Sequence, residues 1–207
     1  NDATPYNHAE IKEAMDLCLS CKGCKIECPS SVDITKMKAE FLQQYYDANG
    51  TPFRSKLVGN FAAQMKFASL FRPIYNFVFG TSALRKIANR LVGFHPNRSM
   101  PLLGKSQLKK WHRYRSVENQ KKVYFFCDEF TNFLDSSIGQ KAILLLERLG
   151  YQVIIPEHLE SGRSYLSKGL LRKAAAIANQ NIQLLSPLVS ADMPIVGIEP
   201  SALLTLR

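Results

Sequence analysis

The chain of 207 residues has 27 Lys and Arg against 17 Asp and Glu, which gives a formal net charge of +10. This length is enough for one or two domains with a hydrophobic core, and no apolar run in the sequence reaches the ~18 residues of a membrane-spanning helix. The charge is uneven: residues 1–50 hold 5 basic and 8 acidic residues, residues 51–116 hold 13 basic and no acidic residues, and residues 117–207 hold 9 of each. We therefore expect three segments of different character.

Residues 1–50 are predicted to form a helical module. Apolar residues recur at helical intervals in "AEIKEAMDLCL". Asp33 is a suitable N-cap for a second helix, "ITKMKAEFLQQYYDAN", which Gly50 would end. The apolar stripe predicted for this second helix consists of Ile34, Met37, Phe41 and Tyr45.

Four of the five cysteines lie between these two helices. They follow the pattern C-x2-C-x2-C-x3-C-P, which is the bacterial ferredoxin run that holds a [4Fe–4S] cluster. Gly23 permits a tight turn inside the run, and Pro29 directs the chain away after it. The predicted cofactor and metal ligands are therefore Cys18, Cys21, Cys24 and Cys28.

Other uses of these thiols fit the pattern less well. Structural zinc takes two separated pairs, or Cys with His, and a disulfide framework suits a small secreted domain, for which no signal peptide is visible. Free thiols at this spacing favour a reducing cytoplasm. In two-cluster ferredoxins the fourth cysteine binds the other cluster. Either all four thiols therefore hold one cluster, or Cys28 serves a second whose partner motif precedes Asn1, in which case the chain is a piece of a longer protein.

Residues 51–116 are predicted to form a basic helical linker. Thr51 and Pro52 begin a helix, Pro73 and Ser82 begin shorter ones, and residues 93–116 look irregular. The first apolar face is expected to consist of Phe53, Leu57, Phe61, Met65 and Leu70, and Trp111 is expected to anchor the irregular part.

The basic linker attracts anionic partners. We favour a solvated face, or one turned toward an acidic neighbouring domain. A membrane-surface contact is the first alternative, because Phe and Leu beside Lys and Arg suit an interfacial helix. A nucleic-acid contact is the least favoured.

Residues 117–207 alternate between strand and helix patterns. The strands are "KVYFFC", "YQVIIP" and "MPIVGIEP", and the helices are "SIGQKAILLLERLG", "LSKGLLRKAAAIANQNIQLL" and "SALLTLR". This alternation predicts βαβ units and a parallel sheet. The predicted fold is thus an α-helical ferredoxin-like cluster module at 1–50, the linker at 51–116, and an α/β domain with a parallel sheet at 117–207 that ends abruptly.

The α/β segment offers few candidates for chemistry. Cys127 is expected to be a buried, inert thiol. His158 and Arg163 follow the second strand, where loops of parallel sheets form binding sites, but we favour ordinary surface residues over a site for an anion. The remaining histidines, His8, His95 and His112, show no metal-ligand spacing, and the sequence has no G-x-G-x-x-G, P-loop or nucleophile elbow.

The stretch "AMDLCLSCKGCKIECPSSVDITKMKAEFLQQY" resembles the iron–sulfur portion of long FAD-linked oxidases, the D-lactate, glycolate and D-2-hydroxyglutarate dehydrogenase type. "VYFFCDEFTNFLDSSIGQKAILLLERLGYQVIIP", "SGRSYLSKGLL" and "PIVGIEPSALLTLR" resemble the cysteine-rich CCG domain that is related to heterodisulfide reductase subunits. Glu160, Ser161 and Ala202 stand where that domain has cysteines, so a second metal centre is not expected there.

The resemblance implies an electron-transfer part of an oxidoreductase, not catalytic by itself. FAD in an upstream domain or a partner subunit would reduce the cluster at Cys18, Cys21 and Cys24, with Cys28 completing it or binding a second. A quinone, a cytochrome or a soluble carrier would then accept the electrons, in the cytoplasm or at the inner face of the membrane. The alternatives are an iron–sulfur subunit of a glycerol-3-phosphate dehydrogenase or heterodisulfide-reductase-like complex, a zinc or nucleic-acid module, and a structural interaction domain.

Overall fold

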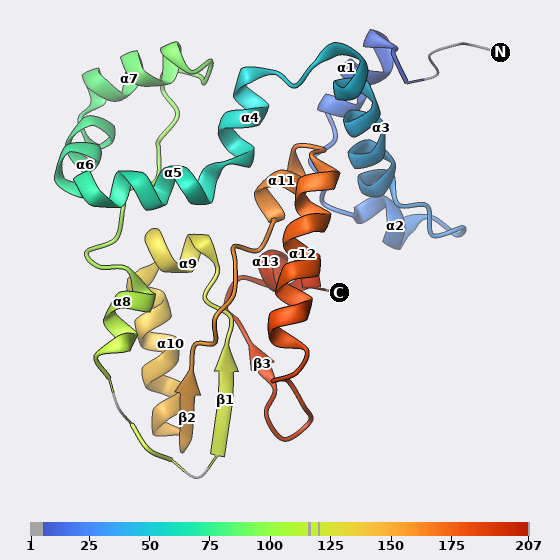
Figure 1. Cartoon of the computed structure of the whole chain (residues 1–207). Coiled ribbons are helices and arrows are strands. Elements are labelled where there is room, and N and C mark those ends of the chain that lie inside the picture. The colour runs from blue at the N-terminus through green and yellow to red at the C-terminus, as the bar shows by residue number, and fades with distance from the viewer. Residues whose placement is uncertain (1–5, 116, 120, 207) are drawn as a thin grey trace. The chain divides into compact units, whose positions relative to one another are not determined.

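The computed structural model describes residues 6–115, 117–119 and 121–206. The chain divides into two compact units, and neither is continuous in sequence. The first unit comprises Asn1–Asn60 and Gly162–Ala176, and the second comprises Phe61–Ser161 and Ile177–Arg207. The described chain is mostly helical with one small parallel sheet, which confirms a mixture of α and α/β structure (Figure 1). The division at residues 50 and 116 stays a prediction, as does the ferredoxin-like character of the first segment.

The described residues of the first unit form helices joined by loops and contain no strand. The expected helix before the cysteines is present. The helix after them begins after Asp33 and ends before Gly50, as the sequence predicted. Its helices are α1 (Ala9–Asp16), α2 (Gly23–Glu27), α3 (Ile34–Asn49), α4 (Phe53–Gly59), α11 (Arg163–Ser167) and the beginning of α12 (Leu171–Leu185).

Helix α3 is the centre of the first unit. The Asp33 carboxylate accepts a hydrogen bond from the backbone N–H of Lys36 at 3.2 Å, and Gly50 ends the helix with φ of 78°. The buried side differs from the predicted stripe, of which Phe41 alone is buried, because α3 packs against the turn at Gly169. The buried side chains of α3 are Ala39, Phe41, Leu42 and Tyr46.

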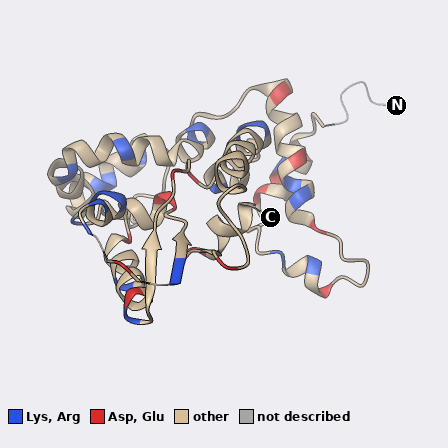
Figure 2. Ribbon diagram, turned by 60° about the horizontal axis from the view of Figure 1, so that its bottom comes forward, with Lys and Arg blue, Asp and Glu red and all other residues tan. Residues whose placement is uncertain are grey.

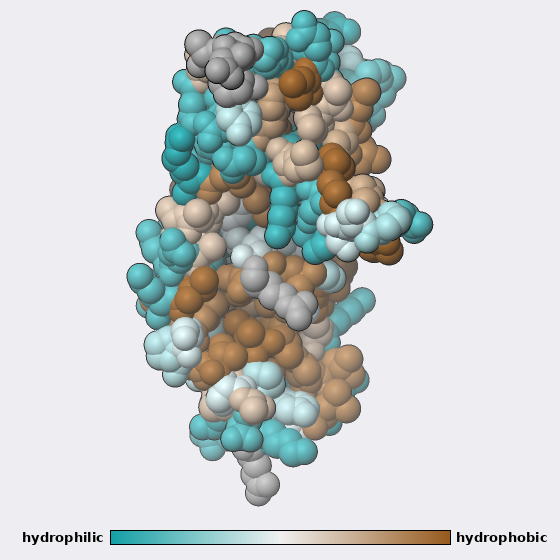
Figure 3. Space-filling model, turned by 90° about the vertical axis from the view of Figure 1, so that its right-hand side faces the viewer, coloured by the Kyte–Doolittle hydropathy of each residue, from teal (hydrophilic) through white to brown (hydrophobic). Residues whose placement is uncertain are grey.

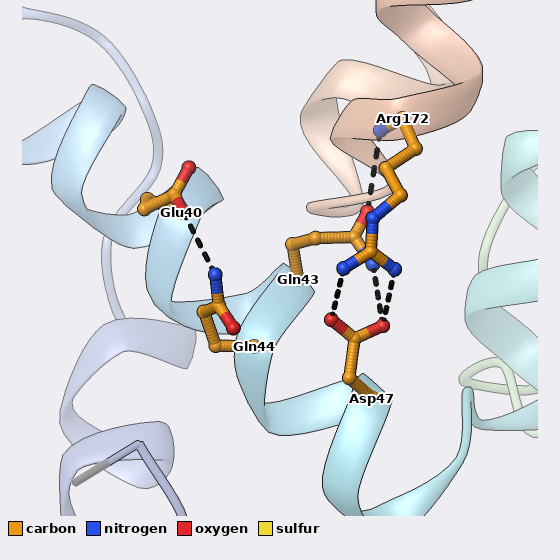
Figure 4. A network of polar contacts seen from close by, with 5 residues as sticks. All are labelled: Glu40, Gln43, Gln44, Asp47 and Arg172. Atoms are coloured by element: carbon orange, nitrogen blue, oxygen red, sulfur yellow. Dashed lines mark hydrogen bonds and ion pairs between the residues drawn. The ribbon is translucent and has the colours of Figure 1, made fainter.

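An exposed polar network joins α3 to the first turns of α12 within this unit. Arg172 donates to both carboxylate oxygens of Asp47, at 2.7 and 2.6 Å, and its backbone N–H donates to Gln43 at 3.3 Å (Figure 4). The Arg172 guanidinium lowers the pKa of the Asp47 carboxyl. The ion pair between Arg172 and Asp47 thus links the two segments of this unit, which are far apart in sequence.

The second unit combines a helical region with the α/β region. The predicted restarts at Pro73 and Ser82 are confirmed, whereas the stretch 93–116 is not wholly irregular, because it contains α8. The elements are α5 (Phe61–Ala68), η1 (Ser69–Phe71), α6 (Arg72–Gly80), α7 (Ser82–Leu91), α8 (Leu108–Arg113), β1 (Lys121–Phe125), α9 (Glu129–Phe133), α10 (Ser136–Arg148), β2 (Tyr151–Ile154), the end of α12, β3 (Ile195–Val196), α13 (Pro200–Leu203) and η2 (Leu204–Leu206).

The three strands form a parallel sheet, as the alternating pattern predicted, and their order in the sheet is β2-β1-β3. Val123 pairs with Val153 across β1 and β2, and Phe125 pairs with Val196 across β1 and β3. The connection through α10 is a βαβ unit, and the next connection returns to the other side of β1. The core between the sheet and its helices consists of Leu108, Val123, Phe125, Cys127, Ile143 and Val153, with Trp111 packed against it as expected.

Two details of the predicted helices are wrong. The pattern "LSKGLLRKAAAIANQNIQLL" is not one helix, because Gly169 has φ of 70° and separates α11 from α12. The helix expected to start at Pro52 begins at Phe53, and Asn60 separates it from α5. The expected face is therefore broken: Phe53 and Leu70 are exposed, and Met65 is buried.

The surface of the second unit is apolar beside β3. A groove of about 230 Å³ is lined by Ile182, Leu185, Val189, Ile195 and Leu206, together with Asn181 and Ser186. Figure 3 shows hydrophobic side chains gathered on the side of the molecule that includes β3 and the end of α12. None of the helices within the described ranges is both long enough and apolar enough to span a bilayer.

Candidate functional site

The four clustered cysteines lie on a short loop and a single-turn helix of the first unit. Cys18 follows α1, Cys24 lies in α2, and Cys28 is the residue at which α2 ends. Ser20, Lys22 and Ser31 have φ between 52° and 61°, and they are the only non-glycine residues of the described chain with positive φ. That conformation is costly for residues with a Cβ and tends to occur where a functional site determines the backbone.

The structure does not assemble these thiols into a ligand set. Cys21 and Cys24 are exposed, and Cys18 and Cys28 are half-buried. No group of three or more Cys, His, Asp or Glu side chains stands ready to hold a metal in residues 6–115, 117–119 and 121–206. The assignment of Cys18, Cys21, Cys24 and Cys28 as ligands therefore stays a prediction from their spacing.

The surroundings of Cys28 favour a negatively charged sulfur. Hydrogen bonds from the backbone N–H groups of Val32, Ser30 and Ser31 lower the pKa of the Cys28 thiol, and they outweigh the opposing effect of burial. The thiolate is the form that binds metal ions. Next to the run, the ammonium group of Lys38 donates to the carbonyl of Cys18 at 2.6 Å and fixes the backbone at the first thiol.

Apolar side chains around the run have little to pack against. Leu17, Leu19 and Ile26 are each more than 80% exposed, and neither α1 nor α2 has a buried residue. Hydrogen bonds from amide groups to the sulfurs are among the means by which a protein adjusts the potential of an iron–sulfur cluster. The donor chemistry of this segment therefore fits such a cluster.

A second polar cluster lies at the carboxyl end of β1 in the second unit. The backbone N–H of Cys127 donates to Nε2 of His158 at 3.2 Å, and Nδ1 of His158 donates to the carbonyl of Leu159 at 2.6 Å. The ammonium group of Lys109 donates to the His158 carbonyl at 3.4 Å. Because the ring both accepts and donates, the imidazole is neutral.

Burial controls the protonation of this cluster. It raises the pKa of the Cys127 thiol to about 12 and, with the nearby Lys109 ammonium, lowers the pKa of His158 to about 4. Burial also lowers the pKa of Lys109. A protonated thiol and a neutral imidazole are poorly suited to nucleophilic or acid chemistry near pH 7.

A buried carboxylate secures the loop after β2 to α9. Glu129 accepts hydrogen bonds from the backbone N–H and the hydroxyl of Ser161 at 2.9 and 2.8 Å, and the carbonyl of Ser161 accepts from the hydroxyl of Thr205 at 2.7 Å. Burial raises the pKa of Glu129 despite these donors. Ala202, near Thr205, is also fully buried. Ser161 and Ala202, two of the positions at which the resemblance to the CCG domain implies cysteines, are thus buried residues that form hydrogen bonds or pack in the interior.

The expectation that His158 is an ordinary surface residue is wrong. Its ring is only 7% exposed, because it packs on Phe126 with ring centroids 4.4 Å apart. Arg163 begins α11 and is half-buried, and Cys127 is buried as predicted. Sequence reasoning missed Lys109 and Glu129, although the run "CDEFTN" directly after a strand was a signal for polar residues at the sheet edge.

Comparison with known proteins adds the decisive observation. The chain is similar to D-2-hydroxyglutarate dehydrogenases. It is 26% identical to that of Escherichia coli over 213 residues, 26% identical to that of Pantoea ananatis over 216 residues, and 24% identical to that of Pseudomonas putida over 213 residues. Each match covers 98% of this chain and 21% of the relative.

The chain therefore spans about a fifth of the length of these curated relatives. No family model matches it, and no solved structure is significantly similar to it. The similarity runs through both units, since it leaves out almost none of the chain.

Proposed function

We propose that this chain is the iron–sulfur, electron-transfer portion of a flavin-linked 2-hydroxyacid dehydrogenase. The observation that supports the proposal most strongly is the similarity to D-2-hydroxyglutarate dehydrogenases along 98% of the chain. The four-cysteine run supports the same conclusion independently, because its spacing is typical of ferredoxins.

In this proposal Cys18, Cys21 and Cys24 hold one [4Fe–4S] cluster, and Cys28 completes it or binds a second. A bound cluster supplies one-electron transfer. The amide N–H groups that surround Cys28 favour added negative charge at sulfur, and Lys22 and Lys25 beside the run act in the same direction. The role of these residues is to hold the ligand atoms and adjust their charge.

The other partners in the reaction lie outside this chain in our proposal. FAD, in another domain or subunit, oxidises a D-2-hydroxy acid and delivers electrons to the cysteine run. The final acceptor is a quinone, a cytochrome or a soluble carrier on the cytoplasmic side. The buried, neutral cluster around Cys127 and His158 stabilises the α/β region and takes no part in the chemistry.

The test uses the natural protein that contains this chain, prepared without oxygen. Cys21→Ser and Cys24→Ser remove exposed thiols of the run, and Cys127→Ala is the matched control outside it. A D-2-hydroxy acid should bleach the flavin of all variants, whereas electron delivery to a quinone or cytochrome should fall at least about a hundredfold in the two run variants only.

Two outcomes would contradict the proposal. If the run variants deliver electrons as fast as the unaltered protein, the cysteines serve another purpose. If no D-2-hydroxy acid bleaches the flavin but glycerol 3-phosphate does, the chain belongs to another class of dehydrogenase.

A further inference from the structure

Helices α5, η1 and α6 of the second unit follow one another directly along the chain (Figure 1), and they expose several large apolar side chains, which we call the stripe. Phe67 lies in α5, Leu70 and Phe71 lie in η1, and the three-residue spacing of Ile74 and Phe77 places these two on one side of α6. All of these side chains are between 51% and 73% exposed, far more than a stripe that packs on its own core. The stripe consists of Phe67, Leu70, Phe71, Ile74 and Phe77.

This exposure is not the result of a loosely held segment. The amide of Asn76 donates to the carbonyl of Leu103 at 2.9 Å and accepts from its N–H at 2.8 Å. The fully buried Asn89 donates to the carbonyls of His95, Pro96 and Arg98. The loop after α7 is therefore fastened by polar side chains to α6 and α7, while the apolar stripe stays in solvent.

Helix α7 also exposes large apolar side chains, and basic residues stand next to them in sequence. Ile87 and Leu91 are four residues apart and are 60% and 80% exposed. Lys86 and Arg90, each next to one of them in sequence, are also exposed. A helix with exposed aliphatic residues and cations at the same interval is typical of an element that lies in a membrane interface.

The charge around these helices has one sign. Residues 51–116 hold 13 Lys and Arg and no Asp or Glu, and Figure 2 shows α5, α6, α7 and α8 with basic but no acidic bands. A surface of this kind repels cationic and attracts anionic partners. A protein surface buried against it would need to supply many compensating carboxylates.

A basic pocket lies beside η1 and the start of α6. It has a volume of about 410 Å³ and is lined by Ser69 and Arg72, which are neighbours in sequence of Leu70 and Phe71. The rest of the lining includes two further cations and two aromatic rings that are amphipathic. These residues are Lys105, Lys110, Trp111 and Tyr114.

We propose that the stripe and α7 dock on the surface of an anionic phospholipid bilayer, with lipid phosphates drawn to the basic pocket. The apolar side chains enter the acyl boundary, the exposed Tyr114 lies at headgroup level, and Arg72, Lys105 and Lys110 face the phosphates. Stable attachment without a spanning helix needs two signals, apolar insertion and basic charge, and this face has both. The proposal concerns a different surface from the cysteine run and does not depend on a bound cluster.

The test measures co-sedimentation of the natural protein with vesicles. The vesicles contain phosphatidylcholine alone, or phosphatidylcholine with phosphatidylglycerol. The apolar variant is Phe71→Ser with Phe77→Ser, and the charge variant is Lys86→Glu with Arg90→Glu. The matched controls are Leu149→Ser, just after the end of α10, and Lys141→Glu on α10, which alter an exposed apolar and an exposed basic residue elsewhere in the same unit.

We expect binding to the anionic vesicles only, weakened by at least about tenfold in both double variants and unchanged in the controls. Circular dichroism and the thermal midpoint show whether each variant is folded. The proposal is overturned if the natural protein does not co-sediment with anionic vesicles. It is also overturned if the folded double variants bind these vesicles as well as the controls do.

Discussion

The ring of His158 receives a hydrogen bond from the backbone N–H of Cys127 at 3.2 Å, directly after β1. The other ring nitrogen donates to the Leu159 carbonyl at 2.6 Å, so both nitrogens are used only in the neutral form. The sequence predicts that His158 lies on the surface, but in the structure its side chain links the loop after β2 to the end of β1. The consequences of this contact can be measured as a function of pH.

The free energy of unfolding should fall as the pH drops from about 6.5 to about 4. The native pKa of His158 is lowered to about 4 by burial and by Lys109. In that window the unfolded chain therefore binds a proton that the native chain does not. The full loss amounts to roughly 3 kcal/mol. Urea titrations at pH 7 and pH 4.5 measure it.

His158→Gln serves as the comparison, because an amide oxygen can accept the Cys127 bond without titrating. The loss of stability between the two pH values should be smaller in this variant than in the unaltered chain. The raised pKa values of Asp128 and Glu129 act in the opposite direction, but they cancel when the two chains are compared. An identical loss in both chains would show that His158 is not buried as a neutral ring. His95→Gln, which alters an exposed histidine, is the control.

Thiol labelling should separate Cys127 from the other cysteines in metal-free protein. Cys127 is 2% exposed and the pKa of its thiol is raised to about 12 by burial. At pH 8 its thiolate fraction is on the order of a thousandfold below that of an ordinary thiol. Mass spectrometry after a short iodoacetamide pulse should find Cys21 and Cys24 alkylated and Cys127 untouched until urea is added. Early labelling of Cys127 would contradict the buried position.

Gly169→Ala should destabilise the first unit strongly. Gly169 has φ of 70°, and an added Cβ would lie 2.3 Å from Cβ of Leu42 in α3. Backbone strain of about 1–2 kcal/mol and overpacking of about 1–3 kcal/mol then act together. Gly50→Ala is the matched control, because Gly50 has φ of 78° but nothing within 4 Å of the added atom. Thermal or urea unfolding measures the stability of both variants. If they lose the same free energy of unfolding, Gly169 does not contact α3 as closely as described.

Asn89→Ala should cost roughly 2 to 4 kcal/mol of unfolding free energy, since three backbone carbonyls lose the donor that holds them. The shortest of these bonds, to the Arg98 carbonyl, is 2.8 Å. Asn89→Asp should be worse still, because a carboxylate of the same shape would face those carbonyls with no proton to donate. Urea unfolding compares both with Asn97→Ala, which alters an exposed amide on the same loop. If Asn89→Ala lowers the free energy of unfolding no more than Asn97→Ala does, the hydrogen bonds of Asn89 do not hold this loop in place.

Local signals in the sequence predicted much of the fold. Asp33 and Gly50 bound α3 because capping and positive φ are properties of single residues. The three strands and their parallel direction follow from alternation with helices of sufficient length. The four-cysteine run is found by spacing alone, since ligand geometry limits where the thiols can stand.

Long-range packing was beyond the reach of these signals. The buried side of α3 is set by the turn at Gly169, more than a hundred residues away, so Met37 is exposed although it belongs to the predicted stripe. His158 is buried because a strand ends beside it, which no neighbouring residue reveals. The structure does not bring the four thiols together as a ligand set, so their predicted role still depends on their spacing.

Anaerobic reconstitution of the natural protein with iron and sulfide, followed by EPR of the reduced sample, tests the central claim most directly. The account predicts bound iron with a matching amount of acid-labile sulfide and the EPR signal of a reduced [4Fe–4S] cluster, present in Cys127→Ala and lost or altered in Cys21→Ser. Protein that stays colourless and iron-free, or that binds zinc without sulfide, would contradict it.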